Sequence, residues 1–429
     1  MDHELLMFSL NDSHNKKDAF SKLDDFLKKI EDINPKYIYF GAQESTHGGG
    51  FITKFNDELL SDGSYINITD GIFEIKAGNS NTRLGHNCNV ASALYIRSDL
   101  IINNIKINKE NISSIARLHS LMHLTINKGA IKISFNTGKL KFVIVNTHLY
   151  FKAEDVEQSY KTRADELTSL LEHLLPYYNE GCFVIIHGDL NFRLDPRDNQ
   201  HSMLINKDKI EEHTRKILID YSRYSLLESV VAKNLFSSMK SKLNFLNNEN
   251  LVETDPKKDG KKVVQKYKKV LLKYDQLYRY FSDRVSTQNN GFSNSFNKNI
   301  PNEERLKLSF YKKMLNNMLN SPFFITCKYN TINNNKVNSK KPDEYNITSY
   351  DTVIKKKKFL RPSSITSRLP SACDRFLFAY SGSVETNVDI GKIDNVMTTT
   401  DHSGLLAVVY ILDHETTRET LTQNNYVPL

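Results

Sequence analysis

The stretch Phe183–Asp195, FVIIHGDLNFRLD, carries the sharpest structural signal in the chain. It opens on a run of four apolar residues, the pattern of a strand that is buried on both faces. An acid, an amide and a guanidinium follow within five positions, as Asp189, Asn191 and Arg193. Ligand sites of layered α/β proteins collect where strands end, so this stretch predicts an α/β fold with a polar site at the strand tip.

Predicted strands and helices cover most of the remaining chain. Helical spacing of apolar residues predicts helices over 16–32 and 153–175. Strands are predicted over 4–10, 36–45, 72–76, 90–97, 100–107, 115–126, 130–136, 140–147, 182–187, 374–380, 393–398 and 404–412.

Strand patterns at both ends of the chain predict one domain over 1–429 whose sheets need both termini. A Lys-rich and Asn-rich stretch at about 200–320 is helical in pattern and is expected to form an insertion. The following stretch, about 330–358, is low in apolar residues and predicts a polar loop.

Composition narrows the class of protein. Of 429 residues, 39% are hydrophobic and 25% are charged, which is ordinary for a globular protein. The net charge of +8 favours anionic partners such as phosphates, nucleic acid or an acidic membrane surface. The four cysteines form no C-x-x-C pair, which argues against a zinc site and indicates free thiols in a reducing compartment. With no apolar run of membrane-spanning length and no signal-peptide pattern at the N-terminus, we expect a cytoplasmic location.

Polar or ionisable residues follow five of the predicted strands. One such residue is usually structural, whereas five of them at strand ends indicate a shared site. They are Asn11, Glu44, His148, Asp189 with Asn191, and Asp401 with His402.

The acids and amides of this set suit metal-assisted hydrolysis of a phosphate ester. Glu44 and Asn11 offer the hard oxygen ligands that Mg²⁺ prefers. Asp189 would orient or deprotonate an attacking water. Asn191 would donate a hydrogen bond to a phosphate oxygen.

The two histidines of the set suit stabilisation of an anion. His148 and His402 can donate hydrogen bonds to a group whose charge changes in the transition state. Asp401, next to His402, can accept from the imidazole N–H and fix its orientation.

These strand ends lie in motifs that resemble, in order, those of the exonuclease–endonuclease–phosphatase superfamily. The resemblance implies two mixed β-sheets packed as a sandwich and flanked by helices, a four-layer α/β/β/α fold of the DNase I-like kind, and the use of Mg²⁺. Members cut very different phosphodiesters and monoesters, so this level leaves the substrate open. The motifs are GAQES, NTHL, GDLNFR and TDHSG.

Finer motifs resemble one family, the inositol polyphosphate 5-phosphatases. HGDLNFR is similar to the first signature of that family, and RLPSACDRFLF is similar to the second. Three further blocks occur in the family's order, so the resemblance spans about Asn11 to Tyr410. They are TINKGAIKISF (Thr125–Phe135), YDQL (Tyr274–Leu277) and FITCKYN (Phe323–Asn330).

The resemblance implies a Mg²⁺-dependent phosphomonoesterase. Its substrates would be phosphoinositides, such as phosphatidylinositol 4,5-bisphosphate or 3,4,5-trisphosphate, or soluble inositol polyphosphates, cleaved at the 5-phosphate. Nucleic acid is not expected as a partner. Asp374 is expected to form a buried ion pair with Arg375 that orients the site. Expected substrate contacts are Lys128, Arg193, Lys328, Tyr329 and Arg375.

Some positions depart from the family pattern. His187 stands where the family has Trp, and Ala372 stands where it has an aromatic residue before Cys373. No proposed catalytic group is lost. We expect the missing aromatic walls to alter how the substrate is held and to lower turnover.

Alternative functions remain to be weighed. A cysteine-based phosphatase is excluded because no cysteine has Arg six positions later. A nuclease of the same superfamily would share Glu44, Asp189, Asn191 and His402, but it would not be expected to carry LPSACDR or TCKY. A catalytically weak or inert module that binds phosphoinositide head groups is the third class.

Lys355–Lys358 suits either a solvated loop or peripheral contact with ring phosphates or an anionic membrane.

Overall fold

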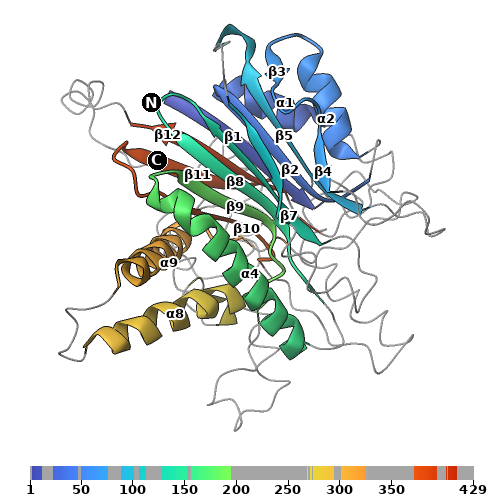
Figure 1. The fold of residues 1–429 in the computed structure, drawn as a ribbon. Coiled ribbons are helices and arrows are strands. Elements are labelled where there is room, and N and C mark those ends of the chain that lie inside the picture. The colour runs from blue at the N-terminus through green and yellow to red at the C-terminus, as the bar shows by residue number, and fades with distance from the viewer. Residues whose placement is uncertain are drawn as a thin grey trace, which may run out of the picture.

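Helices cover both outer faces of a pair of packed β-sheets in the computed structural model (Figure 1). This is the predicted four-layer α/β/β/α architecture. The structure describes residues 2–11, 23–46, 50–75, 88–100, 106–112, 128–151, 156–194, 268, 271–272, 274–293, 301–324, 326, 372–393, 402 and 404–412.

The larger sheet has seven strands. They are β1 (Asp2–Asn11), β2 (Tyr37–Thr46), β3 (Tyr65–Asn67), β4 (Phe73–Ile75), β5 (Cys88–Arg97), β11 (Thr386–Ile393) and β12 (Gly404–Ile411). Their order is β11-β12-β1-β2-β5-β3, with β4 also paired to β5. The β1–β2 pair is parallel and the others are antiparallel, so the sheet is mixed. Because β1 pairs with β12, segments from the two ends of the chain lie side by side at its centre.

The smaller sheet has five strands. They are β6 (Asn108–Asn111), β7 (Gly129–Asn136), β8 (Lys141–His148), β9 (Phe183–Asp189) and β10 (Asp374–Ala379). Their order is β10-β9-β8-β7-β6, and only β8–β9 is parallel among these pairs. Each sheet therefore has one parallel pair, and the carboxyl ends of both pairs carry predicted site residues.

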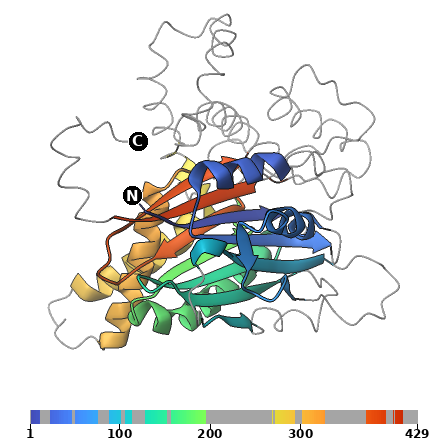
Figure 2. The same cartoon turned by 90° about the horizontal axis from the view of Figure 1, so that it is seen from above.

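Two sets of helices complete the outer layers, as the view from above also shows (Figure 2). The helices α1 (Leu23–Ile33) and α2 (Phe51–Leu60) pack on the larger sheet. The helices α4 (Val156–Asn179), α8 (Gln276–Ser293) and α9 (Asn302–Asn320) pack on the smaller sheet. Within the described ranges, no helix has the length and apolar character needed to cross a bilayer.

The strand β9 shows why the opening stretch is apolar at consecutive positions. Phe183 and Ile185 lie in the core between the two sheets. Val184 and Ile186 pack on the other side, beneath the helices. Both faces of this strand are covered, so every position of the run is buried. Asp189 continues the Phe183 series and therefore lies on the face toward the other sheet.

Some elements differ from those predicted. The helix α2 and the strand β11 were not predicted, although Phe51, Ile52, Phe55 and Leu59 form a helical apolar face. A strand was predicted over 100–107. Residue 100 instead ends a 3₁₀ helix, Ser98–Leu100, and the strand β6 begins at residue 108.

Other predictions fall partly or wholly beyond the described residues. These are the strands over 115–126 and 393–398, of which only Ile393 is described, and the polar loop at about 330–358. The helices α8 and α9 lie within the stretch of about 200–320 that is helical in pattern, and the single domain over 1–429 stays a prediction.

Candidate active site

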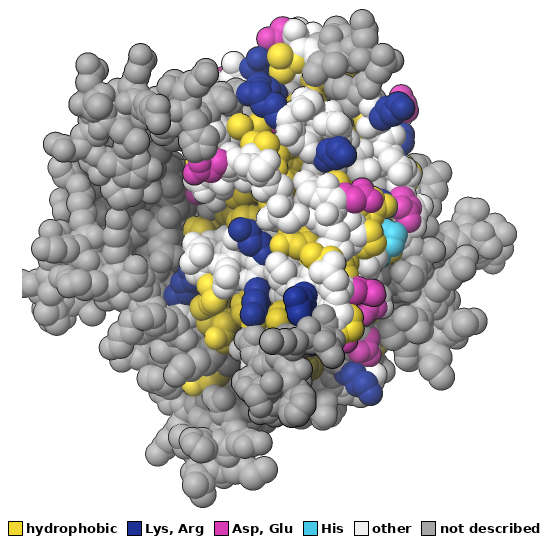
Figure 3. Space-filling model, turned by 60° about the vertical axis from the view of Figure 1, so that its left-hand side comes forward, with side chains coloured by type: hydrophobic (Ala, Val, Ile, Leu, Met, Phe, Trp, Pro, Cys, Tyr) yellow, Lys and Arg dark blue, Asp and Glu magenta, His cyan; other side chains and the backbone are white. Residues whose placement is uncertain are grey.

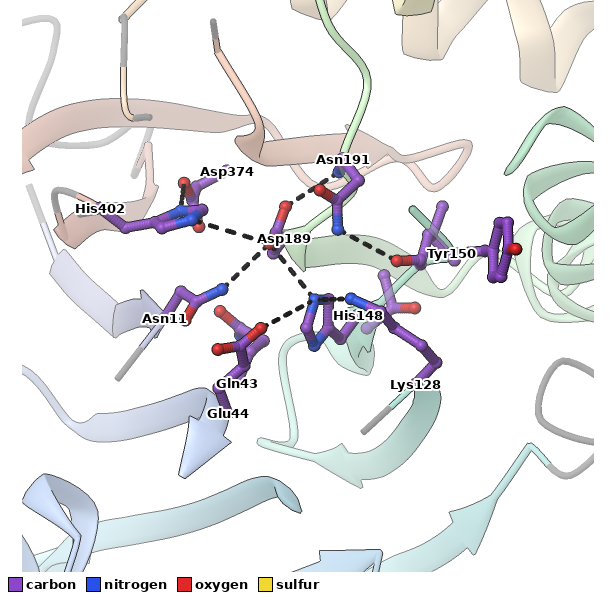
Figure 4. A network of polar contacts seen from close by, with 12 residues as sticks. Asn11, Gln43, Glu44, Lys128, His148, Tyr150, Asp189, Asn191, Asp374 and His402 are labelled. Carbon is purple, nitrogen blue, oxygen red and sulfur yellow. Dashed lines mark hydrogen bonds and ion pairs between the residues drawn. The ribbon is translucent and has the colours of Figure 1, made fainter. Parts of the chain in front are cut away.

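Three strands of the smaller sheet place their site residues in register. His148 at the end of β8 pairs with Asp189 at the end of β9, and Asp374 at the start of β10 pairs with Asp189 from the other side. Residues in register point to the same face of a sheet, which here is the face toward the larger sheet. Figure 4 shows the polar network that results.

The larger sheet reaches Asp189 through the end of β1. The side-chain nitrogen of Asn11 donates a hydrogen bond to Asp189 Oδ2 at 3.0 Å. Asn11 and Asp189 are both buried. This bond joins the two sheets at one end of the sandwich, where the carboxyl ends of β1 and β9 meet (Figure 4).

The end of β2 contributes Gln43 and Glu44 through an irregular backbone. The pairing of β2 with β5 shifts register between Ala42 and Ser45, and Glu44 has a left-handed φ of 53°. Strand alternation alone would send neighbouring side chains to opposite faces. The irregularity instead brings Glu44 Oε1 to 3.7 Å from His148 Nε2.

Asp189 is contacted by residues from both sheets. Its Oδ1 accepts the backbone N–H of Asn191 at 3.0 Å, and its Oδ2 lies 3.3 Å from His148 Nε2 and 4.0 Å from His402 Nε2. Burial opposes its charge, but His148, His402 and Lys128 outweigh this effect and hold its pKa well below the ordinary value. Asp189 is therefore an anionic acceptor, and its low basicity suits orienting a water better than removing a proton.

His148 is buried among charged neighbours. Burial and the nearby Lys128 ammonium, which contacts His148 Nε2, lower its pKa. Burial also lowers the pKa of Lys128, against the opposing pull of Asp189, Glu44 and Glu166. Lys128 and His148 are therefore influenced by two of the same carboxylates, those of Asp189 and Glu44.

His402 contacts a carboxylate at the start of β10. Its Nδ1 lies 2.7 Å from Asp374 Oδ2. The predicted acceptor, Asp401, lies outside the described residues. The expected ion pair between Asp374 and Arg375 is wrong, because neighbouring residues of β10 point to opposite faces. Arg375 pairs instead with Asp275.

Asn191 and Arg193 follow β9, and their side chains are hydrogen-bonded to each other. Asn191 has a left-handed φ of 55°, and its side-chain nitrogen donates to the carbonyl of Leu149 at 3.0 Å. Its Oδ1 accepts from Arg193 Nη2 at 3.0 Å. The Arg193 guanidinium also lies over the ring of Phe151, 4.2 Å from the centroid. Both predicted residues are therefore near Asp189, and both side chains are held by neighbouring loops.

The remaining predicted substrate contacts are placed differently. Arg375 lies on the face of β10 toward the helices, where its Nε donates to the carbonyl of Ala372 at 2.5 Å and its guanidinium covers the ring of Phe323. These contacts favour a supporting role. Lys328 and Tyr329 lie outside the described residues.

The oxygen atoms at the end of β2 suit a hard divalent cation. The side-chain nitrogen of Asn146 donates to the carbonyls of Ala42 and Ala91, so its oxygen must accept from Gln43 Nε2, at 2.6 Å. This fixes Gln43 Oε1, which is buried with no hydrogen-bond partner within the part of the chain that the structure describes. A buried oxygen without a donor, beside the Glu44 carboxylate, fits a site for Mg²⁺.

A second grouping with metal-ligand geometry overlaps this site. Ligand atoms of Asp189, Asp374 and His402 all lie within 4.8 Å of one another. The hydrogen bond between His402 and Asp374 already accounts for two of these groups. We therefore interpret this trio as an oriented histidine beside an anion.

Sequence reasoning missed two residues of the network, Gln43 and Asn146, as hydrogen-bonding partners. Both had a signal, since each occupies a polar position near the end of an apolar strand and shares its face with the neighbouring core residues. Asp374 was predicted to orient the site, but with Arg375 as its partner; its contact with His402 could not be predicted, because His402 lies beside a strand of the other sheet.

The chain is similar to several solved structures. Three similar solved structures are a Cimex nitrophorin ferrous NO complex, the inositol polyphosphate 5-phosphatase domain of SPsynaptojanin with inositol (1,4)-bisphosphate and calcium, and D. rerio TDP2 with a single-strand DNA product. Their identities are 14%, 13% and 11%, and their TM-scores are 0.44, 0.40 and 0.40. The matches cover 95%, 97% and 95% of this chain, and 98%, 87% and 100% of the other chains.

No curated protein matches the sequence. The model of Endonuclease/Exonuclease/phosphatase family 2 matches residues 9–240, which is more than half of the chain and includes the end of β1 and all of β2, β8 and β9. The chain therefore belongs to the Endonuclease/Exonuclease/phosphatase family 2.

Proposed function

We propose that this protein is a Mg²⁺-dependent phosphomonoesterase that removes the 5-phosphate from phosphoinositides or soluble inositol polyphosphates. The observation that carries the phosphoesterase assignment is the ionised Asp189 flanked by two imidazole nitrogens, those of His148 at 3.3 Å and His402 at 4.0 Å. The finer assignment rests on the 5-phosphatase-like motifs, above all RLPSACDRFLF and HGDLNFR.

Asp189 and the residues around it have different proposed roles in the reaction. Asp189, fixed by the Asn11 amide, would orient a water for in-line attack on phosphorus. His148 and His402 would hold the phosphate oxygens as charge develops on them. Asn191 would add a donor from the adjoining loop, and no covalent enzyme intermediate is expected.

The proposed cation would be held by Glu44 with Asn11. A bound divalent cation would offset negative charge on the phosphoryl or leaving-group oxygen. The protein's own part is to aim the Glu44 carboxylate inward, which its left-handed backbone achieves.

Substrate recognition would fall to basic side chains beside the reacting phosphate. Lys128 contacts His148, and Arg193 lies over Phe151, so both cations are close enough to the site to meet ring phosphates. Lys328, Tyr329 and Arg375 remain further proposed contacts.

Figure 3 shows the distribution of charged side chains on one face of the molecule. On the part of this face that the structure describes, Lys and Arg side chains are spread singly or in small groups, and Asp and Glu side chains lie among them (Figure 3).

The proposal is tested by phosphate release from a panel of soluble inositol phosphates and short-chain phosphoinositides, with Mg²⁺ and with EDTA. We expect Mg²⁺-dependent release from members that carry a 5-phosphate. Single-stranded and duplex DNA are assayed beside them. Release from no member, together with DNA cleavage, would replace the proposal with a nuclease. Binding of head groups without turnover would replace it with the inert module.

A further inference from the structure

The buried side chain of Arg163 joins the connections that carry the site residues. Arg163 lies on α4, on the helix side of the smaller sheet, and is 1% exposed. It is among the largest fully buried side chains that the structure describes. Its guanidinium is not part of the network around Asp189, yet it contacts the loops on which Asn191 and Arg193 depend.

The first of these connections follows β8. Arg163 Nη1 donates to Ser159 Oγ at 2.8 Å and reaches the carbonyl of Tyr150 at 3.4 Å. One turn along the same face of α4, Glu166 accepts the backbone N–H of Tyr150 at 2.8 Å. Both polar groups of the Tyr150 backbone are therefore held from α4. The residue before it, Leu149, provides the carbonyl that fixes the Asn191 side chain.

The second connection follows β9. Arg163 Nη2 donates to Gln276 Oε1 at 2.8 Å. The same oxygen accepts the backbone N–H of Arg193 at 3.1 Å, and the backbone N–H of Gln276 donates to the Arg193 carbonyl at 3.0 Å. Arg163 thus reaches the backbone of Arg193 through one intervening side chain.

The faces of the guanidinium contact both connections as well. The Arg163 Cζ atom lies 5.8 Å from the ring centroid of Phe151 and 5.6 Å from that of Phe192. The same Phe151 ring carries the guanidinium of Arg193 on it, at 4.2 Å. Phe151 is therefore near both the buried arginine and the arginine that is proposed to meet substrate.

Burying a guanidinium at this position carries a desolvation penalty, which indicates a specific role for the side chain. Burial lowers the pKa of Arg163 to about 10, and its Nε has no hydrogen-bond partner within the described part of the chain. A well-packed apolar side chain would avoid this desolvation. An apolar side chain has no fixed fork of donors, however, and could not set two loops at defined positions.

We propose that Arg163 is a positioning residue, which sets the loop after β8 and the loop after β9 so that Asn191 and Arg193 meet the phosphate. The inference rests on the proposed phosphatase reaction for its kinetic consequence. The role in positioning the two loops rests on the contacts alone and can be measured without a substrate.

The kinetic test uses the full chain and the best substrate of the inositol phosphate panel. Arg163→Met is expected to lower kcat/KM about 100-fold, because small displacements of positioned groups have effects of that size. Arg163→Lys keeps the charge without the fork and should recover only part of the loss. In an Arg193→Ala background, Arg163→Met should add a loss clearly smaller than 100-fold, because only its effect on the loop after β8 and on Asn191 remains.

Leu171→Ala is the matched control, because Leu171 is a buried core residue of the same helix. It should lower the unfolding midpoint while leaving kcat/KM within about twofold of the wild type. Should Arg163→Met fail to fold, Gln276→Met cuts the same link from the other side and takes its place in the cycle. Activity within about twofold of the wild type, or the full 100-fold loss repeated in the Arg193→Ala background, would overturn the proposal.

Amide hydrogen exchange separates this proposal from the proposed function. In Arg163→Met and Gln276→Met, the Arg193 amide should exchange about 10-fold faster, while the amides of β9 keep their wild-type protection. Leu171→Ala should not produce this local change. If no panel member releases phosphate, the proposed function fails, and faster exchange at Arg193 still supports the positioning role. Unchanged exchange at Arg193 in both variants refutes it.

Discussion

The Nδ1 atom of His402 lies 2.7 Å from Asp374 Oδ2, while its Nε2 faces Asp189 Oδ2 at 4.0 Å. Asp374 and Asp189 are register partners on adjacent strands of one sheet, whereas His402 lies just before a strand of the other sheet. The Asp374 carboxylate therefore holds one nitrogen of the His402 imidazole, while the other nitrogen lies near Asp189. This arrangement gives His402 a fixed orientation before any substrate arrives.

Asp374→Asn should lower kcat about 10- to 100-fold with little change in KM, as for other outer partners of functional histidines. Asn keeps the shape of the side chain but removes the charge that holds the imidazole N–H. Steady-state phosphate release checks this. Asp62→Asn, in the turn after α2, changes an exposed carboxylate and is the control. Equal kcat in the wild type and Asp374→Asn would exclude an orienting role.

Asp275 should be a strong determinant of stability. Its Oδ1 accepts the backbone N–H groups of Leu277 and Tyr278 at the start of α8, at 2.8 and 2.9 Å, and its Oδ2 pairs with the buried Arg375. Asp275→Ala would leave that guanidinium unpaired, so the free energy of unfolding should fall by about 3–5 kcal/mol in urea denaturation. Asp283→Ala, an exposed position on the same helix, should change it by less than about 0.5 kcal/mol.

The double variant Asp275→Ala/Arg375→Met sharpens this prediction. Removing both charges leaves no buried ion without a partner, so the double variant should lose less stability than the sum of the two single variants. Additive losses would show that the two side chains act independently.

His187 should make the protein sensitive to acid. Its ring lies between the sheets, stacked on Phe376 and edge-on to Tyr39, and both nitrogens lack hydrogen-bond partners within the described residues. Burial lowers its pKa from 6.5 to about 3. The unfolded chain therefore binds the proton first, and stability falls as the pH decreases from 6.5 towards 3, by about 5 kcal/mol in full.

Replacement of His187 tests this contribution. His187→Phe removes the titrating group and should flatten the decline of stability between pH 7 and pH 5, as measured by urea denaturation at each pH. The stability of the variant relative to that of the wild type should therefore increase between pH 7 and pH 5. Parallel declines in the two proteins would show that other groups control acid stability.

Glu44→Gln should weaken the response to Mg²⁺. The substitution removes a charge from the proposed cation site while keeping the size of the side chain. The Mg²⁺ concentration for half-maximal activity is expected to rise about 10-fold or more. Glu58→Gln, on the exposed side of α2, should leave it unchanged. An unchanged Mg²⁺ response in Glu44→Gln would place the cation elsewhere.

The sequence was informative where the backbone is regular. Apolar runs locate β1, β2, β8 and β9, and the carboxyl ends of parallel neighbours must lie at the same edge, so Asn11, Glu44, His148 and Asp189 could be grouped in advance. The direction of the Glu44 side chain could not be predicted, because it depends on a local left-handed residue within a strand.

Contacts between distant segments were harder to predict. Strand alternation alone excludes the pair Asp374–Arg375, yet the true partners, His402 and Asp275, come from other parts of the chain. A lone arginine in a polar helical pattern usually lies in solvent, so nothing local marks Arg163 as buried. Its position follows from how α4 packs against two loops.

Regioselectivity is the most direct test of the central claim, that the site removes a 5-phosphate. Short-chain phosphatidylinositol 4,5-bisphosphate is incubated with the wild type and with Asp189→Asn in Mg²⁺, and the remaining head group is identified by mass and by chromatography against isomeric standards. We predict the 4-monophosphate as the product of the wild type, and a rate at least about 100-fold lower for Asp189→Asn. A 5-monophosphate product, or equal rates for the two proteins, would contradict the account.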